Sequence, residues 1–278
     1  MITDWQTNTI YFSELLKTDL RFAENSKQIF SILDSFNTKY KFLQSTNDIW
    51  ARDYMPIQIN NNEFIEYRYD PDYLQGKWKG CRNLKTYPDI VCDKINLKTT
   101  KSDIIMDGGN FVKSSNCVIL TEKIVSENRF HFIKTGLFKK IQDTFKVEKV
   151  VLIPQDKKDI YGHTDGMIRF IDNETVLINH FYKSDAVIQS RLKKAGLKIE
   201  VIDYKVKKSD KRNWAYLNFL QTKDLILLPK FDIEEDEQAF NQINNFYTEY
   251  KGKVLQVEMS EIVKLGGALN CITWTTKE

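Results

Sequence analysis

The sequence predicts an α/β protein built from five similar units that surround a common axis. Short apolar strands alternate with segments of helical spacing along the whole chain. A polar residue that enters a strand recurs five times, at Asp53, Asp107, Asp165, Asn218 and Cys271. A turn and a second apolar strand follow each of them except the last. The intervals between these residues are 54, 58, 53 and 53 positions. Repeat periods of this size are typical of stacked or radial architectures.

The individual elements follow from local patterns. The first 45 or so residues are expected to be helical, because segments 13–16 and 26–33 carry apolar residues at three- and four-residue spacing, and to lie outside a sheet-based core. Paired strands are then expected at 55–59 with 64–69, 111–112 with 117–120, 166–170 with 175–178, and 214–220 with 225–228. Helices between the pairs are expected at 129–134, 185–192 and 234–240.

The last unit differs from the others because the chain stops before a return strand would begin. We expect its apolar segment, residues 264–274, to form a buried strand that carries Cys271 into the interior. No stretch rich in Pro, Gly or Ser interrupts the chain, so we expect one domain over residues 1–278.

The composition limits the class of protein. Hydrophobic residues make up 42% and charged residues 28%, as in ordinary globular proteins. The formal net charge of +3 predicts no binding to nucleic acid or to an anionic membrane. No run reaches the roughly 18 apolar residues of a membrane span, and residues 1–6 do not begin a secretory signal. The four cysteines lack CxxC spacing, which argues against a disulfide framework or a zinc knuckle. We expect a cytoplasmic protein.

Five units around an axis would gather the polar residues at the strand starts, with His163 beside Asp165. Three carboxylates in a restricted site repel one another and lose hydration, so they need a cation. A metal could use His163, Asp165, Asp107 and Cys271, but soft thiolate and hard carboxylates suit different metals. We therefore expect no metal and no cofactor.

A guanidinium group suits this site better. Its five N–H donors form a planar fork that matches paired carboxylates. Its central carbon would lie within reach of Cys271, whose reactive thiolate a bound cation favours. His163 could protonate the departing amine and later take a proton from water. Taken alone, Cys271 also fits a structural buried cysteine, and Arg52 with Asp53 fits a surface ion pair.

Four motifs, in order, resemble those of the agmatine deiminases and the bacterial peptidylarginine deiminases. Residues 50–56, WARDYMP, resemble W-x-R-D-x-G-P, and residues 107–110, DGGN, resemble an acid-Gly-Gly element. Residues 162–165, GHTD, resemble G-H-x-D, and residues 266–273, GGALNCIT, resemble the final G-G-x-x-H-C element. Three residues depart from the usual pattern: Asp107 replaces a glutamate, Met55 a glycine and Asn270 a histidine.

The resemblance implies the five-bladed α/β-propeller of the guanidine-modifying, or pentein, superfamily. It implies that Cys271 is the nucleophile and His163 the general acid and base, with Asp107 orienting and charging His163. It further implies a set of substrate-binding residues: Asp53 and Asp165 as guanidinium clamps, with Asn218, Trp50 and Asn110.

We therefore expect a hydrolase that converts a guanidinium to a ureido group through a covalent thiouronium, with agmatine as the first substrate to test and putrescine biosynthesis as its setting. A homo-oligomer is possible. One alternative is action on free or peptidyl arginine, for which Arg68, Lys77 or Lys79 could bind a carboxylate or carbonyl. A second is amidino transfer to an amine, and a third is non-catalytic binding of a guanidinium ligand.

Overall fold

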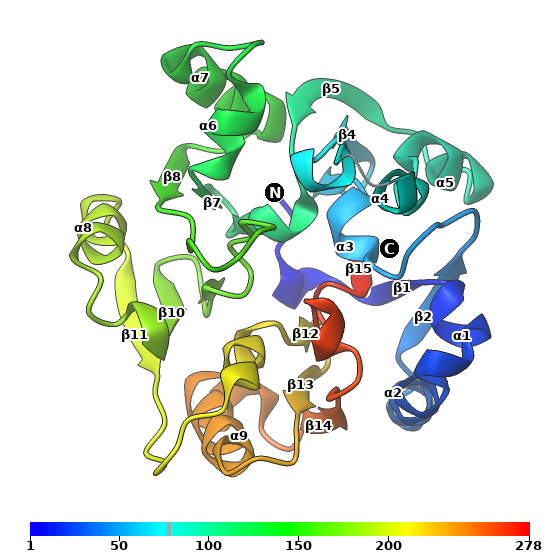
Figure 1. Ribbon diagram of the computed structural model, residues 1–278, viewed down its shortest axis with the longest axis vertical. Coiled ribbons are helices and arrows are strands. Elements are labelled where there is room, and N and C mark those ends of the chain that lie inside the picture. Colours follow the sequence, from blue (N-terminus) through cyan, green and yellow to red (C-terminus); the bar gives the residue numbers. More distant parts are fainter. Residues whose placement is uncertain (77–78) are drawn as a thin grey trace.

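Five three-stranded sheets surround a central axis in the computed structural model, which describes residues 1–76 and 79–278 (Figure 1). In each sheet the first strand pairs antiparallel with the second, and the second pairs parallel with the third. Parallel neighbours require a crossover connection, and the crossover in every unit contains helix. The predicted five-unit α/β-propeller is confirmed.

The strands of four sheets follow one another along the chain. They are β3 (Ile57–Asn60), β4 (Glu63–Arg68) and β5 (Thr100–Ile105); β6 (Val112–Lys113), β7 (Cys117–Thr121) and β8 (Lys149–Ile153); β9 (Ile168–Phe170), β10 (Thr175–Asn179) and β11 (Lys198–Ile202); β12 (Leu220–Gln221), β13 (Ile226–Lys230) and β14 (Val254–Glu258).

The fifth sheet joins the two ends of the chain. It consists of β15 (Thr273–Thr276), β1 (Thr9–Ser13) and β2 (Lys39–Leu43). Strand β15 pairs antiparallel with β1, from Phe12 opposite Thr273 to Thr9 opposite Thr276. The return strand that the C-terminal unit lacks is therefore supplied by the N-terminal segment, and this pairing closes the ring.

Helices lie mainly at the rim of the ring, where Figure 1 shows α2, α5, α7, α8 and α9. The α-helices are α1 (Leu15–Thr18), α2 (Ala23–Ser35), α3 (Ala51–Tyr54), α4 (Lys79–Asn83), α5 (Pro88–Lys94), α6 (Lys123–Asn128), α7 (Lys134–Phe145), α8 (Ala186–Lys194) and α9 (Glu235–Phe246). The 3₁₀ helices are η1 (Asp4–Gln6), η2 (Leu20–Phe22), η3 (Asp72–Leu74), η4 (Gly108–Asn110), η5 (His180–Tyr182), η6 (Lys211–Leu217), η7 (Thr248–Tyr250) and η8 (Val263–Leu265).

The longer helices pack one apolar stripe against the sheets. In α7 the buried residues are Leu137, Ile141 and Phe145, spaced by four. In α9 Ala239 and Ile243 have the same spacing and are fully buried. Such i, i+4 positions lie on one helix face. The expected helices at 185–192 and 234–240 are confirmed as α8 and α9.

The expectation for the first 45 residues is wrong in part. Helix α2 is present, but residues 9–13 and 39–43 form strands β1 and β2. All five residues of β1 are buried. A strand buried on both faces shows no alternation, so its sequence resembles a short buried helix.

The helix expected at 129–134 is also wrong. Helix α6 ends at Asn128, whose buried side chain hydrogen bonds to the backbone of Ile105 and Ile124. Residues 129–133 connect α6 to α7, and Phe130 and Ile133 are 82% and 78% exposed. Their apolar spacing therefore does not mark a buried helix face.

Two further expectations require correction close to the axis. Cys271 lies in a turn before β15 rather than within a strand. Most of segment 214–220 belongs to η6, and only Leu220 belongs to the short strand β12. Residues 267–274 and 215–220 are nevertheless buried, whereas residues 264–266 of the expected buried strand are exposed, with Leu265 at 44%.

In the described part of the chain, no helix combines the length and the apolar character that crossing a membrane requires.

Candidate active site

Short segments that precede the first strands of the units converge at the axis. Asp53 lies in α3, Asp107 precedes η4, and Asp165 lies in the loop before β9. Asn218 follows η6, and Cys271 precedes β15. All five side chains are buried, with exposed fractions of 6% or less. The polar residues that recur about every 55 positions in the sequence therefore form one cluster in the fold.

His163 lies between two carboxylates. Its Nε2 is 3.1 Å from Oδ2 of Asp107, and its Nδ1 is 3.8 Å from Oδ1 of Asp53. Burial by itself lowers the pKa of His163, but the charge of Asp53 and the hydrogen bond and charge of Asp107 raise it to about 10. The imidazole is therefore protonated at neutral pH. Asp107 reaches His163 even though its side chain is one methylene shorter than glutamate.

Cys271 lies beside Asp165, with 3.5 Å between Sγ and Oδ2 of the carboxylate. The same oxygen accepts hydrogen bonds from the amides of Asn218 at 2.9 Å and Asn270 at 2.7 Å. Burial, followed by the charges of Asp165 and Asp53, raises the pKa of the thiol. Without a cation, the thiol is protonated at neutral pH.

Asn218 connects two parts of the site. Its Oδ1 accepts hydrogen bonds from the backbone N–H groups of Cys271 at 3.2 Å and Ala268 at 3.1 Å. Its Nδ2 donates to Asp165. One buried amide therefore holds the cysteine turn and the carboxylate in a fixed relation.

The glycines of two motifs permit close approach of their segments. A Cβ at Gly109 would lie 2.5 Å from Nδ1 of His163 and 2.7 Å from Oδ1 of Asp53. A Cβ at Gly267 would lie 2.3 Å from the ring of Trp50. Side chains at these positions would therefore push the site apart.

The carboxylate of Asp53 is close enough to those of Asp107 and Asp165 for their charges to act on it. Its Oδ1 accepts a hydrogen bond from the backbone of Gly109 at 3.1 Å, and Tyr67 donates its hydroxyl to the Asp53 carbonyl. Burial raises the pKa of Asp53 well above the ordinary range, and although His163 acts in the opposite direction, the carboxylates of Asp107 and Asp165 raise the pKa further. A bound cation would relieve this repulsion.

Two cavities meet at Cys271 and His163. The smaller measures about 200 Å³ and includes Asp53 and Trp50 in its lining, whereas the larger measures about 710 Å³ and includes Asp165. Both are lined by Tyr161, which lies against Gly266. The reactive groups are thus accessible from two directions.

Two other predicted residues, Asn110 and Arg68, are not part of the lining of either cavity. Asn110 is buried, and its Oδ1 accepts hydrogen bonds from Thr121 and Thr164, so it braces the loops behind His163. Arg68 is exposed and pairs with Asp70 at 2.9 Å, and it lines neither cavity. Lys77 and the side chain of Lys79 lie outside the described residues.

Two acidic residues of the site, Asp159 and Asp48, are not among the predicted residues. Asp159 holds the loop before His163, because its carboxylate accepts the backbone N–H groups of Tyr161 and His163 at 2.8 and 2.9 Å. Asp48 accepts the backbone N–H of Trp50 at 2.9 Å and lines the smaller cavity. A signal for Asp48 was available, because it lies two positions before the motif that begins at Trp50. Nothing in the sequence singled out Asp159.

Among the side chains that the structure describes, no group of three or more His, Cys, Asp or Glu is arranged to hold a metal ion.

The five-bladed α/β-propeller brings Cys271, His163 and acidic side chains together at its axis, the arrangement that the motif resemblance implies. Solved structures share this fold. An agmatine deiminase of C. jejuni covers 100% of this chain and 95% of its own, with a TM-score of 0.76 at 16% identity. The agmatine deiminase of Enterococcus faecalis gives 0.75 at 19% identity, with 100% and 95% covered. An amidinotransferase of Microseira wollei gives 0.65 at 13% identity, with 100% and 96% covered.

Sequence comparison gives the family. A protein of Enterococcus faecalis that is assigned as an agmatine deiminase is 26% identical over 276 residues, which cover 82% of this chain and 74% of the relative. The model of the Porphyromonas-type peptidyl-arginine deiminase family matches residues 17–276. The chain belongs to this family of guanidine-modifying hydrolases, as its motifs predicted.

Proposed function

We propose that the protein is a cysteine-dependent hydrolase that converts a terminal guanidinium to a ureido group and releases ammonia, with agmatine as its preferred substrate. The convergence of Asp53, Asp165 and the His163–Asp107 pair around Cys271 carries this proposal. Such a site needs a cationic substrate, because the acids repel one another. The presence of Cys271 indicates a nucleophile, because binding alone would not require a cysteine.

The guanidinium binds between Asp53 and Asp165. Oδ1 of Asp165 accepts no hydrogen bond from any described residue, so it is available to the substrate. The bound cation offsets the negative charges that raise the thiol pKa, and Cys271 releases its proton to solvent. Sγ then attacks the central carbon, and His163 gives a proton to the departing nitrogen as ammonia leaves.

The resulting thiouronium is hydrolysed in a second step. Neutral His163 takes a proton from water as the water oxygen bonds to the central carbon. The carbon–sulfur bond then breaks and the proton of the added hydroxyl passes to solvent, which releases the ureido product and regenerates the thiolate and imidazolium. Asp107 favours the charged imidazole throughout, because it accepts a hydrogen bond from Nε2.

The smaller cavity supports an amine at the far end of the substrate. It is lined by the Asp48 carboxylate and by aromatic rings, among them Trp50 and Tyr73, and no described Arg or Lys lines it. Burial raises the pKa of Asp48 to about 7, and an ammonium partner would keep the group ionised. Asp48 with an aromatic wall suits the ammonium of agmatine and not the carboxylate of arginine.

The larger cavity supports a second candidate, an arginine within a peptide. At about 710 Å³ it exceeds what agmatine needs, and Lys158 and Lys211 could bind a carboxylate or a carbonyl. The exposed ring of Phe181 at its edge offers an apolar contact. Amidino transfer would use the same intermediate with an amine in place of water. Retention of a guanidinium ligand without turnover is the non-enzymatic alternative.

We further propose a single catalytic unit over residues 1–278 that acts in the cytoplasm without nucleic acid or membrane partners. Association into a homo-oligomer is compatible with exposed apolar side chains on the outer helices, such as Ile90 of α5 and Val187 of α8. Agmatine hydrolysis would supply a precursor of putrescine.

The test is ammonia release from agmatine, free arginine and an arginine-containing peptide. Cys271→Ala should abolish release, whereas Cys117→Ala, at another buried cysteine in β7, should retain it. Asp48→Asn should raise KM for agmatine about tenfold and leave KM for arginine unchanged. If the folded wild type released no ammonia from any of the three compounds, a simple deiminase would be excluded. A supplied acceptor amine would then test amidino transfer.

A further inference from the structure

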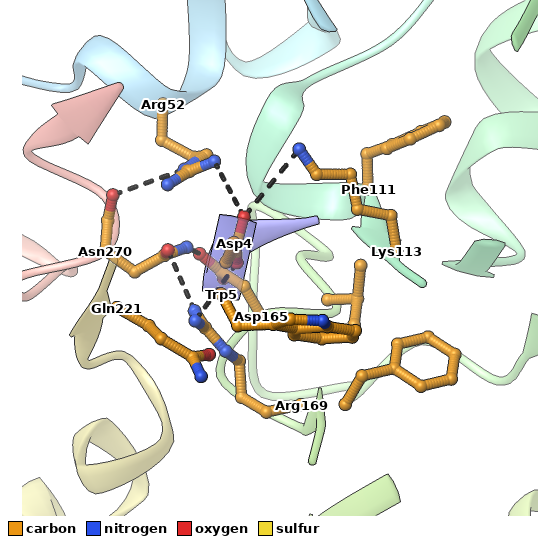
Figure 2. Close-up of a pocket in the computed structure, with 11 residues that line it drawn as sticks. Asp4, Trp5, Arg52, Phe111, Lys113, Asp165, Arg169, Gln221 and Asn270 are labelled. Carbon is orange, nitrogen blue, oxygen red and sulfur yellow. Dashed lines mark hydrogen bonds and ion pairs between the residues drawn. The ribbon is translucent and has the colours of Figure 1, made fainter. Parts of the chain in front are cut away.

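A second polar cluster lies at the axis behind Asp165, around a cavity of about 20 Å³ (Figure 2). Its centre is Asp4 of η1, which faces three cationic side chains. Oδ2 of Asp4 lies 3.1 Å from Arg169, and Oδ1 lies 3.7 Å from Lys113 and 3.9 Å from Arg52. The three cations are each 8% exposed or less. The N-terminal segment thus carries the acidic partner of a buried cationic cluster.

One of these cations connects the cluster to the candidate active site. Nη1 of Arg169 donates to Oδ1 of Asn270 at 2.8 Å. Nδ2 of Asn270 donates to Oδ2 of Asp165 at 2.7 Å. Figure 2 shows the guanidinium of Arg169 linked by dashed lines to Asn270 and to Asp4. A continuous relay, Asp4–Arg169–Asn270–Asp165, therefore reaches the carboxylate beside Cys271.

The chemistry of the relay allows one orientation of the Asn270 amide. Arginine has donors and no acceptor, so the amide oxygen must face Arg169. The amide nitrogen then faces Asp165, which as a carboxylate only accepts. Together with the amide of Asn218 on the same oxygen, this donor fixes the plane of the Asp165 carboxylate and directs Oδ1 away from the relay.

We propose that Asn270 and Arg169 are positioning residues that set the Asp165 carboxylate for the guanidinium, with Asp4 as the anchor of Arg169. The inference rests on the proposed function, in which Asp165 clamps the substrate. Asn270 stands where the family motif has histidine. An amide keeps its N–H donors and its acceptor oxygen at every pH, whereas a histidine loses its acceptor when it is protonated.

Steady-state kinetics of ammonia release from agmatine test the relay. Asn270→Ala and Arg169→Met should each raise KM about tenfold to a hundredfold, as expected for losing a hydrogen bond to a buried charge, with kcat lowered less than about threefold. Lys113→Met is the matched control, because it removes a buried cation of the same cluster that makes no contact with Asn270. Its KM should stay within about twofold of the wild type.

The conservative variant Asn270→His adds a readout that a purely structural role would not change. Neutral histidine can accept from Arg169 and donate to Asp165, so KM should return toward the wild-type value at pH 8. Below about pH 6.5, where histidine is protonated, KM should rise again in this variant and not in the wild type. An unchanged KM in Asn270→Ala with a lower kcat, or an equal rise in Lys113→Met, would overturn the proposal.

A binding measurement keeps the relay testable without turnover. Calorimetry with agmatine should give a Kd about tenfold or more higher for Asn270→Ala in a Cys271→Ser background than for Cys271→Ser alone. If the wild type releases no ammonia while Cys271→Ser binds agmatine, the proposed hydrolysis fails and this Kd ratio alone decides the relay. If Cys271→Ser binds neither agmatine nor arginine, the relay has no substrate to position and is overturned too.

Discussion

Two ionic clusters of opposite composition meet at Asn270. The site around Cys271 holds Asp53, Asp107 and Asp165, and among the described side chains His163 pairs with Asp53 and Asp107; two cavities open into the site. The cluster behind it holds Arg52, Lys113 and Arg169 with one carboxylate, Asp4, and encloses only about 20 Å³.

The difference concerns the carboxylates: in the rear cluster the chain supplies their positive partners, whereas in the front cluster a ligand has to supply them. In the rear cluster the chain supplies the counter-charge: burial alone would raise the pKa of Asp4, but Lys113, Arg169 and Arg52 hold it below its ordinary value. In the front cluster burial raises the pKa of Asp53, and the charges of Asp107 and Asp165 raise it further against the opposing effect of His163. We therefore expect substitutions in front to affect activity, and substitutions behind to affect stability and, where they act through Arg169 and Asn270, the KM for the substrate.

The largest expected effect is that of Asp53→Asn. Removing one partner of a buried charge pair costs about 3–5 kcal/mol, so kcat/KM should fall about 10²- to 10⁴-fold. The free energy of unfolding should stay level or rise, because one of three crowded acids becomes neutral. Kinetics and urea unfolding of the same preparation measure both. Marked destabilisation would show that Asp53 is a structural partner.

Asp107→Asn should act on the protonation of His163. The Asp107 carboxylate contributes to raising the His163 pKa to about 10, so its loss should lower that pKa. In the wild type, kcat/KM should decline above about pH 10 as the imidazolium loses its proton, and in the variant this decline should begin at lower pH. We expect kcat to fall about 10²-fold as general acid catalysis weakens. A pH–rate profile with an unmoved alkaline limb would contradict this role.

Asp4→Asn should destabilise the rear cluster. It leaves three buried cations without their carboxylate, which we expect to lower the free energy of unfolding by about 2–4 kcal/mol. Urea unfolding of Asp4→Asn should be compared with that of Asp53→Asn. The same change from Asp to Asn should leave the free energy of unfolding level or raise it at position 53. Equal destabilisation by both variants would remove the distinction between the clusters.

The smallest effect concerns Lys113. Burial lowers its pKa to about 8. The charge of Asp4 opposes this shift, and the charges of Arg52 and Arg169 add to it. Between about pH 8 and its ordinary pKa of about 10.4, the unfolded chain holds a proton that the native state has lost, so this group makes stability rise with pH. The wild type should gain about 1–3 kcal/mol relative to Lys113→Met across this window. Parallel unfolding curves from pH 7.5 to 10 would contradict the prediction.

The sequence by itself determined the repeat, the motifs and the residue types of the site. The interval of about 55 residues predicted five units, because each Asp, Asn or Cys enters its unit at an equivalent point. The acid, histidine and cysteine types predicted guanidine chemistry, since their combination serves a cationic, electrophilic substrate.

Tertiary structure alone decided the pairings that no local pattern encodes. Strand β1 has the sequence of a buried apolar run, and only its pairing with β15, more than 260 positions away, makes it the closing strand of the ring. Asp4 and Arg169 meet for the same reason, because closure of the ring brings the N-terminal segment to the axis. Long-range pairing depends on which surfaces meet in space, and local spacing reports only the segment in which a residue lies.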